Sequence, residues 1–518
     1  MPNSGDLLRL ADAVLLPGFE GTAPPDWLRR RLGEGLAGVV LFSRNITGPA
    51  QVAELTAALR AENPEVLVGT DEETGEVTRL EVATGSSRPG GYALGVVDDV
   101  TLTEALAGDL GDELAAAGIT IDFAPSADVN SNPDNPVIGL RAFGADPALV
   151  ARHTRAFIRG LQSAGVAACA KHFPGHGDTS VDSHHGVPVV ATDGIEDALH
   201  PFREAIREGV RSIMTGHLLV PAYDAGLPAT LSPKVLTGLL REELGFDGVI
   251  VTDGIEMAAV SGRYGIGGAS VRAIAAGADA ICVGGERAGE ATAVEVRDAI
   301  AAAVTQGLLS EERLADAARR VQELATWTTS SRRGRESAAR TTSSRGGRES
   351  AAWTAAPGRA AGRDGDLGLA AARRAVRVTR RSTADVLPFT GAAQVVELAP
   401  EMNLAIDKRT PWGVGEPLRG LLPGTRVARL TVGQATGAEI ERLIREATGR
   451  PLAIVVRDAH RHLWQAEALR HLLSARPDAV VVEMGLPERS DLGAVHIATY
   501  GSAPVSGLAA AEVITGSL

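Results

Sequence analysis

The chain has 518 residues, of which 44% are apolar and 22% charged, a composition typical of globular domains and unlike that of a disordered or collagen-like chain. Lys and Arg number 51 against 64 Asp and Glu, so the formal net charge is −13, which together with only 3% aromatic residues argues against nucleic-acid binding. Two cysteines exclude a disulfide scaffold and favour a reducing compartment, and with neither a basic leader nor an apolar run of about 18 residues we expect a cytoplasmic protein without membrane contact.

Short apolar runs alternate with longer amphipathic stretches through the first 325 residues. This alternation is typical of βα units, in which helices cover a parallel sheet and the buried strands read as continuous apolar segments. Eight such runs fit a (β/α)8 TIM barrel better than an open doubly wound sheet, which remains the alternative architecture. The predicted strands lie at residues 13–17, 38–42, 66–71, 119–125, 167–173, 212–217, 248–253 and 280–285.

The composition changes at residue 328. Residues 328–340 read TTSSRRGRESAAR and residues 341–353 read TTSSRGGRESAAW, which is a 13-residue tandem repeat. Small, polar and Arg-rich segments bury too little apolar surface to offset the entropy of ordering them, so we predict a flexible linker over residues 328–366. A basic docking segment is the alternative interpretation.

The last 150 residues return to strand–helix alternation, with apolar runs at 394–398, 427–432, 452–456, 479–484 and 495–499. Thr436 followed by Glu439 forms a capping box, which predicts a helix that ends at Ala447. We therefore expect a barrel domain at 1–327, the linker at 328–366, and a smaller α/β domain, a three-layer sandwich, at 367–518. A scaffold or dimerisation role suits this last domain, and the protein is expected to be a monomer or homodimer.

Polar and ionisable residues follow the predicted strands of the barrel. Because chemistry in such barrels is located at the carboxyl ends of the strands, these residues are expected to converge on a polar substrate pocket. They include Asp71 and Arg79 after the third strand, Asp128 and Arg141 after the fourth, Lys171 and His172 in the fifth, His217 after the sixth, and Asp253 after the seventh.

Residues 171–188 hold four of the eleven histidines of the chain. A metal site is one interpretation, but the spacing fits no common zinc pattern and Lys171 is a poor neighbour for a cation. Histidines that merely satisfy loop backbone are a second interpretation. We favour a third, an acid/base loop in which Asp182 orients His184 and raises its pKa, with no metal and no cofactor.

Two further residue choices are informative. Asp253 ends a buried apolar run and precedes a glycine, so its carboxylate could be a nucleophile, a metal ligand or a helix N-cap. Lys171 is one of only three lysines in a chain that otherwise uses Arg, which indicates a site that needs a compact cation with three donors. Hydroxyl-rich ligands such as sugars suit a group of this kind.

The segment KHFPGHGDT at 171–179, followed by DSH at 182–184, resembles the signature of bacterial β-N-acetylglucosaminidases of glycoside hydrolase family 3. The resemblance extends over residues 10–325 and becomes loose beyond them. Further segments that carry it are NPVIGLRAFG at 135–144, IMTGH at 213–217, PATLS at 228–232 and GFDGVIVTD at 245–253.

The resemblance implies a TIM barrel and a retaining double displacement. Asp253 would be the nucleophile, and His184, oriented by Asp182, would be the acid/base. The hydroxyls and N-acetyl group of a small carbohydrate substrate would be held by Asp71, Arg79, Arg141, Lys171 and His172. The implied substrates are cell-wall or chitin-derived fragments with terminal β-linked N-acetylglucosamine, which would place the enzyme in peptidoglycan turnover.

One residue departs from the family pattern. The family has two adjacent glycines within the segment that joins Asp71 to Arg79, and this chain has Thr74 at the first of these positions. If the position takes a positive φ, a β-branched residue is strained there. The strain would affect the placement of Asp71 and Arg79.

Other functions remain open on the sequence. A histidine acid/base tolerates an incoming phosphate where a carboxylate would repel it, so the same site could serve a phosphorylase. A β-glucosidase of the same family and a non-catalytic sugar-binding protein are the remaining alternatives. The presence of Asp253, Asp182 and His184 together argues against the last of these.

Overall fold

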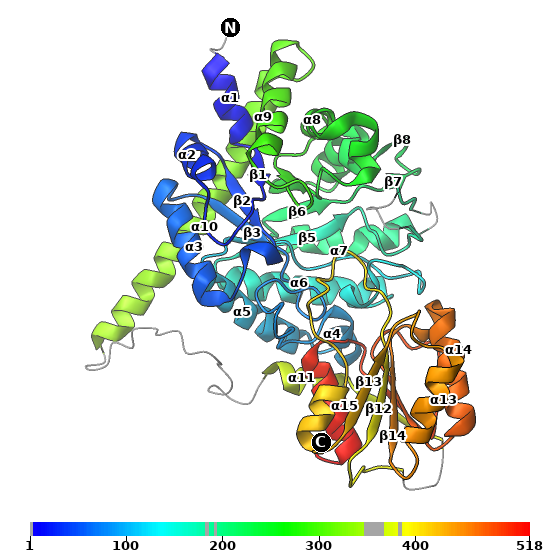
Figure 1. Cartoon of the computed structure of the whole chain (residues 1–518). Helices are drawn as coiled ribbons and strands as arrows, with labels where there is room; N and C mark the ends of the chain where they lie inside the picture. Colours follow the sequence, from blue (N-terminus) through cyan, green and yellow to red (C-terminus); the bar gives the residue numbers. More distant parts are fainter. Residues whose placement is uncertain (1–3, 182–185, 191–193, 346–366, 382–385) are drawn as a thin grey trace. The chain divides into compact units, whose positions relative to one another are not determined.

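The computed structural model describes residues 4–181, 186–190, 194–345, 367–381 and 386–518 (Figure 1). The chain divides into two compact units. The first comprises Met1–Glu72, Val100–Ile138 and Ala145–Arg359, and the second comprises Glu73–Asp99, Gly139–Gly144 and Ala360–Leu518. Among the described residues, no helix combines the length and the apolar character that a membrane span requires.

The first unit is a closed barrel of eight parallel strands. β2, β3, β4, β5, β6 and β9 pair in that order, β1 pairs with β10, a parallel bridge between Val251 and Ala280 joins β9 to β10, and β1 lies beside β2. The predicted TIM barrel is therefore confirmed and the open sheet is wrong. The strands are β1 Leu15–Pro17, β2 Gly38–Leu41, β3 Leu67–Thr70, β4 Ile121–Asp122, β5 Ala167–Phe173, β6 Ser212–Thr215, β9 Val249–Thr252 and β10 Ile281–Val283.

Helices follow the strands and pack against their neighbours in the chain, as α5 does on α6 and α6 on α7. Local signals set their ends: Asp146 caps α6 by accepting hydrogen bonds from the backbone N–H groups of Ala148 and Leu149 at 2.7 and 3.1 Å, and Pro147 occupies the first turn. The helices are α1 Ser4–Asp12, α2 Asp26–Glu34, α3 Pro49–Glu62, α5 Val100–Ala117, α6 Pro147–Ser163, α7 Ile195–Arg207, the π-helix η4 Lys234–Glu243, α8 Ala258–Ala276, α9 Glu290–Thr305 and α10 Glu311–Arg345. A short antiparallel pair, β7 Leu219–Val220 with β8 Asp224–Pro228, follows β6.

The barrel interior is filled by apolar side chains from every strand, and α10 covers one end of it. The buried cluster includes Leu16, Val40, Leu67, Ile121, Cys169, Met214, Val251 and Cys282 from the barrel strands or directly beside them, with Val321, Leu324 and Ala325 from α10. Both cysteines are free, and burial raises the pKa of the Cys169 thiol to about 12. They therefore serve as small apolar residues in the core.

Helix α10 differs from the linker expected to begin at residue 328, because it continues to Arg345 and includes the first copy of the tandem repeat. Thr328 and Thr329 are buried, and Arg332 pairs with Glu336 one turn later at 3.3 Å. Trp327 packs against the barrel cluster, with the guanidinium of Arg211 4.6 Å from its ring centroid. Residues 346–366, which hold most of the second copy, lie outside the described residues.

The second unit contains a six-stranded sheet in the order β11-β16-β15-β14-β12-β13, parallel except for β11. All five predicted strands are present; β11 was missed because its residues alternate without an apolar run, as suits an antiparallel edge strand. The strands are β11 Arg377–Arg380, β12 Gln394–Leu398, β13 Arg426–Leu430, β14 Leu452–Val456, β15 Val480–Glu483 and β16 Val495–Ala498.

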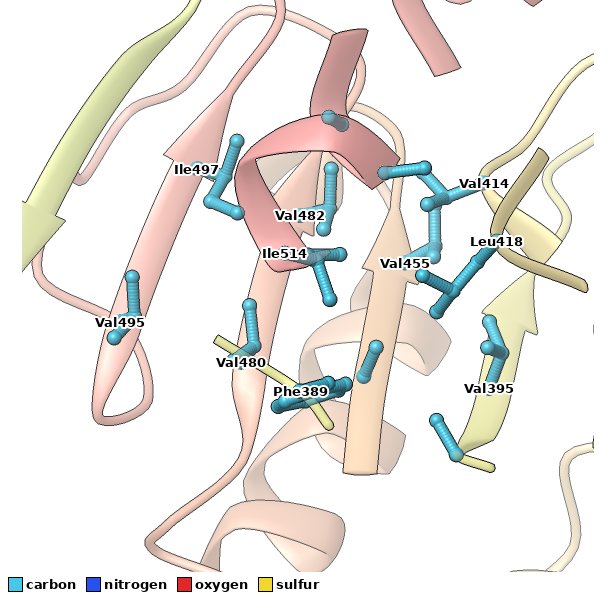
Figure 2. Close-up of a cluster of buried hydrophobic side chains, with 14 of the residues drawn as sticks. Phe389, Val395, Val414, Leu418, Val455, Val480, Val482, Val495, Ile497 and Ile514 are labelled. Atoms are coloured by element: carbon cyan, nitrogen blue, oxygen red, sulfur yellow. The ribbon is translucent and has the colours of Figure 1, made fainter. Parts of the chain in front are cut away.

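Helices cover both faces of this sheet, as the three-layer prediction requires. On one face, α12 Gly415–Leu421 and α15 Pro504–Thr515 pack on alternate strand residues such as Val455 and Val482 (Figure 2). On the other, α13 Gly437–Glu446 and α14 Leu463–Ala475 pack on Ile454 and Val481 (Figure 1). Thr436 caps α13 as predicted, since its side chain accepts a hydrogen bond from the N–H of Glu439 at 3.3 Å. The remaining α-helices described in this unit are α4 Gly91–Val97 and α11 Leu367–Ala375, and it also contains the short 3-10 helices η2 Gly139–Arg141 and η5 Ala459–Arg461.

Candidate active site

In the first unit, the candidate residues lie at the carboxyl ends of the barrel strands. Asp71 directly follows β3, Lys171 and His172 end β5, and Asp253 directly follows β9. The structure thus gathers four of the eight predicted site residues at one rim of the barrel. Asp182 and His184 lie outside the described residues, and the other two, Arg79 and Arg141, belong to the second unit.

Lys171 and Asp71 form an ion pair. The Lys171 ammonium donates to Asp71 Oδ1 at 2.8 Å, and its side chain is only 2% exposed, whereas that of Asp71 is 22% exposed. A buried ammonium is costly unless it is paired, and the Asp71 carboxylate offsets the cost of burying Lys171. The pair thus presents a cation and an anion at the rim, a combination that can both donate to and accept from sugar hydroxyls.

Asp128 orients His172. The fully buried Asp128 accepts from His172 Nδ1 at 2.8 Å, from the His176 backbone N–H at 2.6 Å and from the Ser126 hydroxyl at 3.0 Å. Burial acts to raise the pKa of Asp128, but the charges and hydrogen bonds of His172 and His176 outweigh it and hold that pKa below its usual value. The carboxylate therefore fixes the His172 ring with Nδ1 turned inward. The position of Asp128 after the fourth strand predicted that it would lie in the pocket, but its contact with His172 was not predicted.

The Gly-rich segment after β5 is held by side-chain hydrogen bonds. His176 Nδ1 and Thr179 Oγ1 are 2.6 Å apart, and the Asn135 amide donates to the carbonyl oxygens of His176 and Thr179 at 2.8 and 3.0 Å. The Asn135 Oδ1 in turn accepts from the N–H groups of Val137 and Ile138. Residues 172–179 are therefore held in place by side-chain hydrogen bonds, while the acid/base role predicted for Asp182 and His184 concerns residues outside the described part of the chain.

Asp253 is not a helix N-cap. Helix α8 begins at Ala258, five residues later, and Asp253 Oδ1 accepts from the N–H of Gly254 at 2.7 Å. His217 supports the same turn, because its Nε2 donates to the Gly254 carbonyl at 2.9 Å and its Nδ1 lies 2.8 Å from Thr230 Oγ1. The half-buried carboxylate is thus held in the turn that directly follows β9.

Glu256 joins the turn after β9 to the turn after β10. Its Oε1 accepts from the backbone N–H groups of Gly284 at 3.0 Å, of Gly285, and of Glu286 at 3.2 Å. Glu256 was not predicted, because a glutamate four positions after the end of β9 gives no signal that separates it from a surface residue. Among the described residues, no group of three or more His, Cys, Asp or Glu is arranged to hold a metal ion.

In the second unit, Glu73 binds Arg141. The guanidinium of Arg141, which ends the short helix η2 Gly139–Arg141, contacts the carboxylate through Nε–Oε2 at 2.8 Å and Nη2–Oε1 at 2.7 Å. Both side chains are buried, so this two-point contact fixes the plane of the guanidinium. Arg79 is also buried, and it donates to the carbonyl of Ala405 at 3.1 Å. Sequence reasoning did not identify Glu73.

Thr74 adopts the positive φ that its position in the family pattern suggested. Its φ is +69°, that of Gly75 is +64°, and a Cβ on Gly75 would lie 2.5 Å from the Cα of Gly90. The strain at Thr74 is partly offset by its hydroxyl, which donates to the Pro89 carbonyl at 3.0 Å. The turn between Glu73 and Val77 therefore forms with threonine in place of glycine.

Comparison with known proteins identifies the barrel unit. Residues 30–324 match the model of the glycosyl hydrolase family 3 N-terminal domain. The chain is 36% identical over 283 residues to β-hexosaminidase A of Pseudoalteromonas piscicida, an alignment that covers 50% of this chain and 47% of that protein. It is 42% identical over 220 residues to a β-hexosaminidase of Mycobacterium tuberculosis, covering 41% of this chain and 56% of the relative. The chain therefore spans about half the length of these curated relatives.

A solved structure resembles the chain over nearly its full length. The glycoside hydrolase family 3 β-N-acetylglucosaminidase of a Paenibacillus species is 35% identical to this chain and superposes on it with a TM-score of 0.85. The superposition covers 99% of this chain and 97% of that one. Both units thus have counterparts in a single protein. With the family match extending over more than half of its residues, the chain belongs to glycosyl hydrolase family 3.

Proposed function

We propose that this protein is a retaining exo-β-N-acetylglucosaminidase that hydrolyses terminal β-linked N-acetylglucosamine. The observation that carries the proposal is the set of paired groups at the barrel rim: Lys171 on Asp71 and His172 on Asp128, with the Asp253 carboxylate at the end of β9. The names of the similar proteins, β-hexosaminidases and a β-N-acetylglucosaminidase, support the same activity.

In the proposed mechanism, the Asp253 carboxylate attacks the anomeric carbon and forms a covalent glycosyl-enzyme. His184, oriented by Asp182, protonates the departing oxygen and then removes a proton from the attacking water. Retaining enzymes usually place a second carboxyl group in this role. An imidazolium brings no second negative charge beside Asp253, so the nucleophile stays ionised while the acid is protonated.

Five residues are proposed to bind the sugar. Asp71, Lys171 and His172 would contact its hydroxyls, and Arg79 and Arg141 would contribute guanidinium donors to hydroxyl or N-acetyl oxygens. His172 is suited to this task because Asp128 holds its Nδ1 side at 2.8 Å, which fixes the tautomer and the ring orientation.

The biological setting is also proposed. Cell-wall or chitin-derived fragments are the expected substrates, peptidoglycan turnover the expected process, and the cytoplasm the expected location. The two buried, free cysteines are compatible with a reducing compartment. We expect the enzyme to act as a monomer or homodimer on small carbohydrates, without nucleic acid, membrane or cofactor.

Product analysis tests the proposal. The protein should release p-nitrophenol from p-nitrophenyl N-acetyl-β-glucosaminide, and Asp253→Ala should reduce kcat by at least about a thousandfold, because the covalent route is lost. Free N-acetylglucosamine, with and without inorganic phosphate, is the expected product, and NMR should show the β-anomer forming first. Full activity in Asp253→Ala would refute the mechanism.

Other outcomes would identify the alternative functions. Release of N-acetylglucosamine 1-phosphate would identify a phosphorylase, and faster turnover of the corresponding glucoside would identify a β-glucosidase. Sugar binding without turnover would identify a binding protein.

A further inference from the structure

The second unit contains two segments that come from within the barrel sequence, residues Glu73–Asp99 and Gly139–Gly144. Their packing partners are residues of the C-terminal sandwich. A Cβ on Gly85 would lie 2.4 Å from the ring of Pro504, and the rings of Tyr92 and Tyr500 stack at 6.1 Å between centroids. These two segments carry Arg79 and Arg141, so whatever orders them also orders two of the proposed sugar-binding residues.

A buried polar relay connects this region to the sandwich sheet. Glu76 Oε1 accepts from the backbone N–H of Ser502 at 2.5 Å and from its hydroxyl at 3.1 Å. The same hydroxyl accepts from Arg457 Nη1 at 2.7 Å. All three side chains are buried, so a carboxylate and a guanidinium are joined through one serine hydroxyl that donates to the first and accepts from the second.

The sandwich end of the relay is rigid. Arg457 directly follows β14, and both of its backbone polar groups are bound by the buried side chain of Gln465, which accepts from its N–H at 3.2 Å and donates to its carbonyl at 2.8 Å. The segment before Ser502 is tied to β15, because the Thr499 N–H donates to the Glu483 carbonyl at 3.0 Å. The position of the Ser502 hydroxyl is therefore set by two strand ends of the central sheet.

The other end of the relay lies inside a tight turn. Glu76 belongs to the segment closed by the hydrogen bond from the Glu73 N–H to the Val77 carbonyl at 3.0 Å. Thr74 and Gly75 both have positive φ in this turn, a conformation that needs support from surrounding contacts. Since Glu73 holds Arg141 by two contacts, any shift of the turn moves that guanidinium as well.

We propose that Ser502 is a positioning residue of the glycosidase: by binding Glu76 it fixes the turn 73–77, and through Glu73 it orients Arg141 for the sugar. The C-terminal unit thereby contributes to substrate binding through Ser502 and Arg457, neither of which is assigned to contact the sugar. This inference rests on the proposed function. Because Arg141 would bind the sugar in the ground state and the transition state alike, loss of the relay should act mainly on KM.

Steady-state kinetics on p-nitrophenyl N-acetyl-β-glucosaminide with the full chain tests the relay. Ser502→Ala and Glu76→Ala should each raise KM by roughly tenfold and change kcat by less than about threefold. Glu76→Gln keeps an oxygen that accepts from Ser502, so its KM should stay within about threefold of wild type. Ser506→Ala is the matched control, since this buried hydroxyl has no hydrogen-bond partner in the described part of the chain, and its KM should not change.

A double variant separates a relay from independent structural damage. If Ser502 acts only through Glu76, the KM of Ser502→Ala combined with Glu76→Ala should equal that of Glu76→Ala alone. If the fold-increase in KM of the double variant equals the product of the two single increases, the proposal is overturned. A wild-type KM in Ser502→Ala would overturn it as well.

Wild-type protein assayed in parallel distinguishes this failure from failure of the proposed function. If wild type turns over no N-acetylglucosaminide, the proposed function fails. The relay is then tested by measuring the Kd of N-acetylglucosamine by calorimetry. Ser502→Ala and Glu76→Ala should raise this Kd, whereas Glu76→Gln and Ser506→Ala should leave it close to that of wild type. A wild type that neither turns over substrate nor binds N-acetylglucosamine would refute both.

Discussion

Glu483, the last residue of β15, shows how a single buried carboxyl group can govern pH dependence. Its oxygens accept from the backbone N–H groups of Asp458 and Gly485 at 2.8 and 2.7 Å, yet burial, with a smaller contribution from the Asp458 charge, raises its pKa to about 8. The folded protein thus holds a proton on Glu483 at neutral pH, whereas an unfolded glutamate releases it near pH 4.3. These two donors, with the more distant N–H of Ala459 at 3.5 Å, do not compensate for full burial in the sheet.

This raised pKa predicts a pH-dependent stability. Between about pH 4.3 and 8 the folded state binds more protons than the unfolded state, so stability should fall as pH rises through this window. In wild type, this group should lower the free energy of unfolding by up to about 1.4 kcal/mol for each pH unit in this window. Glu483→Gln stays neutral, so it should lack this decrease and be more stable than wild type at pH 8. Urea unfolding of both proteins at pH 5, 6.5 and 8 measures this. Parallel pH profiles for the two proteins would contradict it.

Helix α10 shows at the element scale why a composition change is a poor guide to a domain boundary. Before residue 328 the buried apolar residues of α10 recur every three or four positions, and Val321, Leu324 and Ala325 complete the barrel interior. Once this part is anchored, adding further turns costs little because each residue gains a backbone hydrogen bond. The tandem repeat was read as a linker from its Ser, Thr and Arg content, but Ala, Arg and Glu in the same repeat favour a helix.

The anchoring of α10 can be tested with one apolar and one charged substitution. Leu324 is 5% exposed in the barrel cluster, so Leu324→Ala should lower the free energy of unfolding by about 3 kcal/mol. Arg332→Ala, which removes a solvent-exposed pair with Glu336, should cost less than about 0.5 kcal/mol. Chemical denaturation followed by tryptophan fluorescence compares them, and equal effects would show that α10 is not held by the barrel core.

At the scale of the whole molecule, chain order and compact units do not coincide. The sequence suggests a barrel followed by a separate sandwich, but residues 73–99 and 139–144 pack as part of the second unit. Asp99 pairs with Arg374 at 2.8 Å, and Glu76 is bound by Ser502. Both segments lie between barrel strands in the sequence, so hydrophobic periodicity assigns them to barrel loops and carries no sign of their distant partners.

Removing residues 360–518 should therefore inactivate the protein even though every barrel strand is retained. The segment 73–99 would lose Pro504, Tyr500 and Arg374, and Arg79 and Arg141 would lose their fixed orientation. We expect kcat/KM on p-nitrophenyl N-acetyl-β-glucosaminide to fall at least about a hundredfold, because misplaced binding groups cost this much. Circular dichroism of the truncated protein checks that the barrel is still folded. Activity within threefold of the full chain would show that the segment orders itself.

Local patterns were sufficient for much of this protein. The eight barrel strands, five of the six sandwich strands and the α13 cap could be predicted because hydrophobic periodicity and capping act between residues a few positions apart. Asp71, Lys171, His172 and Asp253 could be placed at one rim because the carboxyl ends of parallel strands in a barrel share a face.

The partners of these residues could not be predicted in the same way. Three hydrogen-bonded pairs join residues far apart in the sequence: Asp128 with His172, Glu73 with Arg141, and Glu76 with Ser502. Their members are separated by 44, 68 and 426 residues. A buried carboxylate at a loop position looks the same in sequence whether it caps a helix, pairs with a cation or faces water. Only the folded chain selects among these, because burial makes an unpaired charge costly and so requires each one to meet a partner brought near by distant packing.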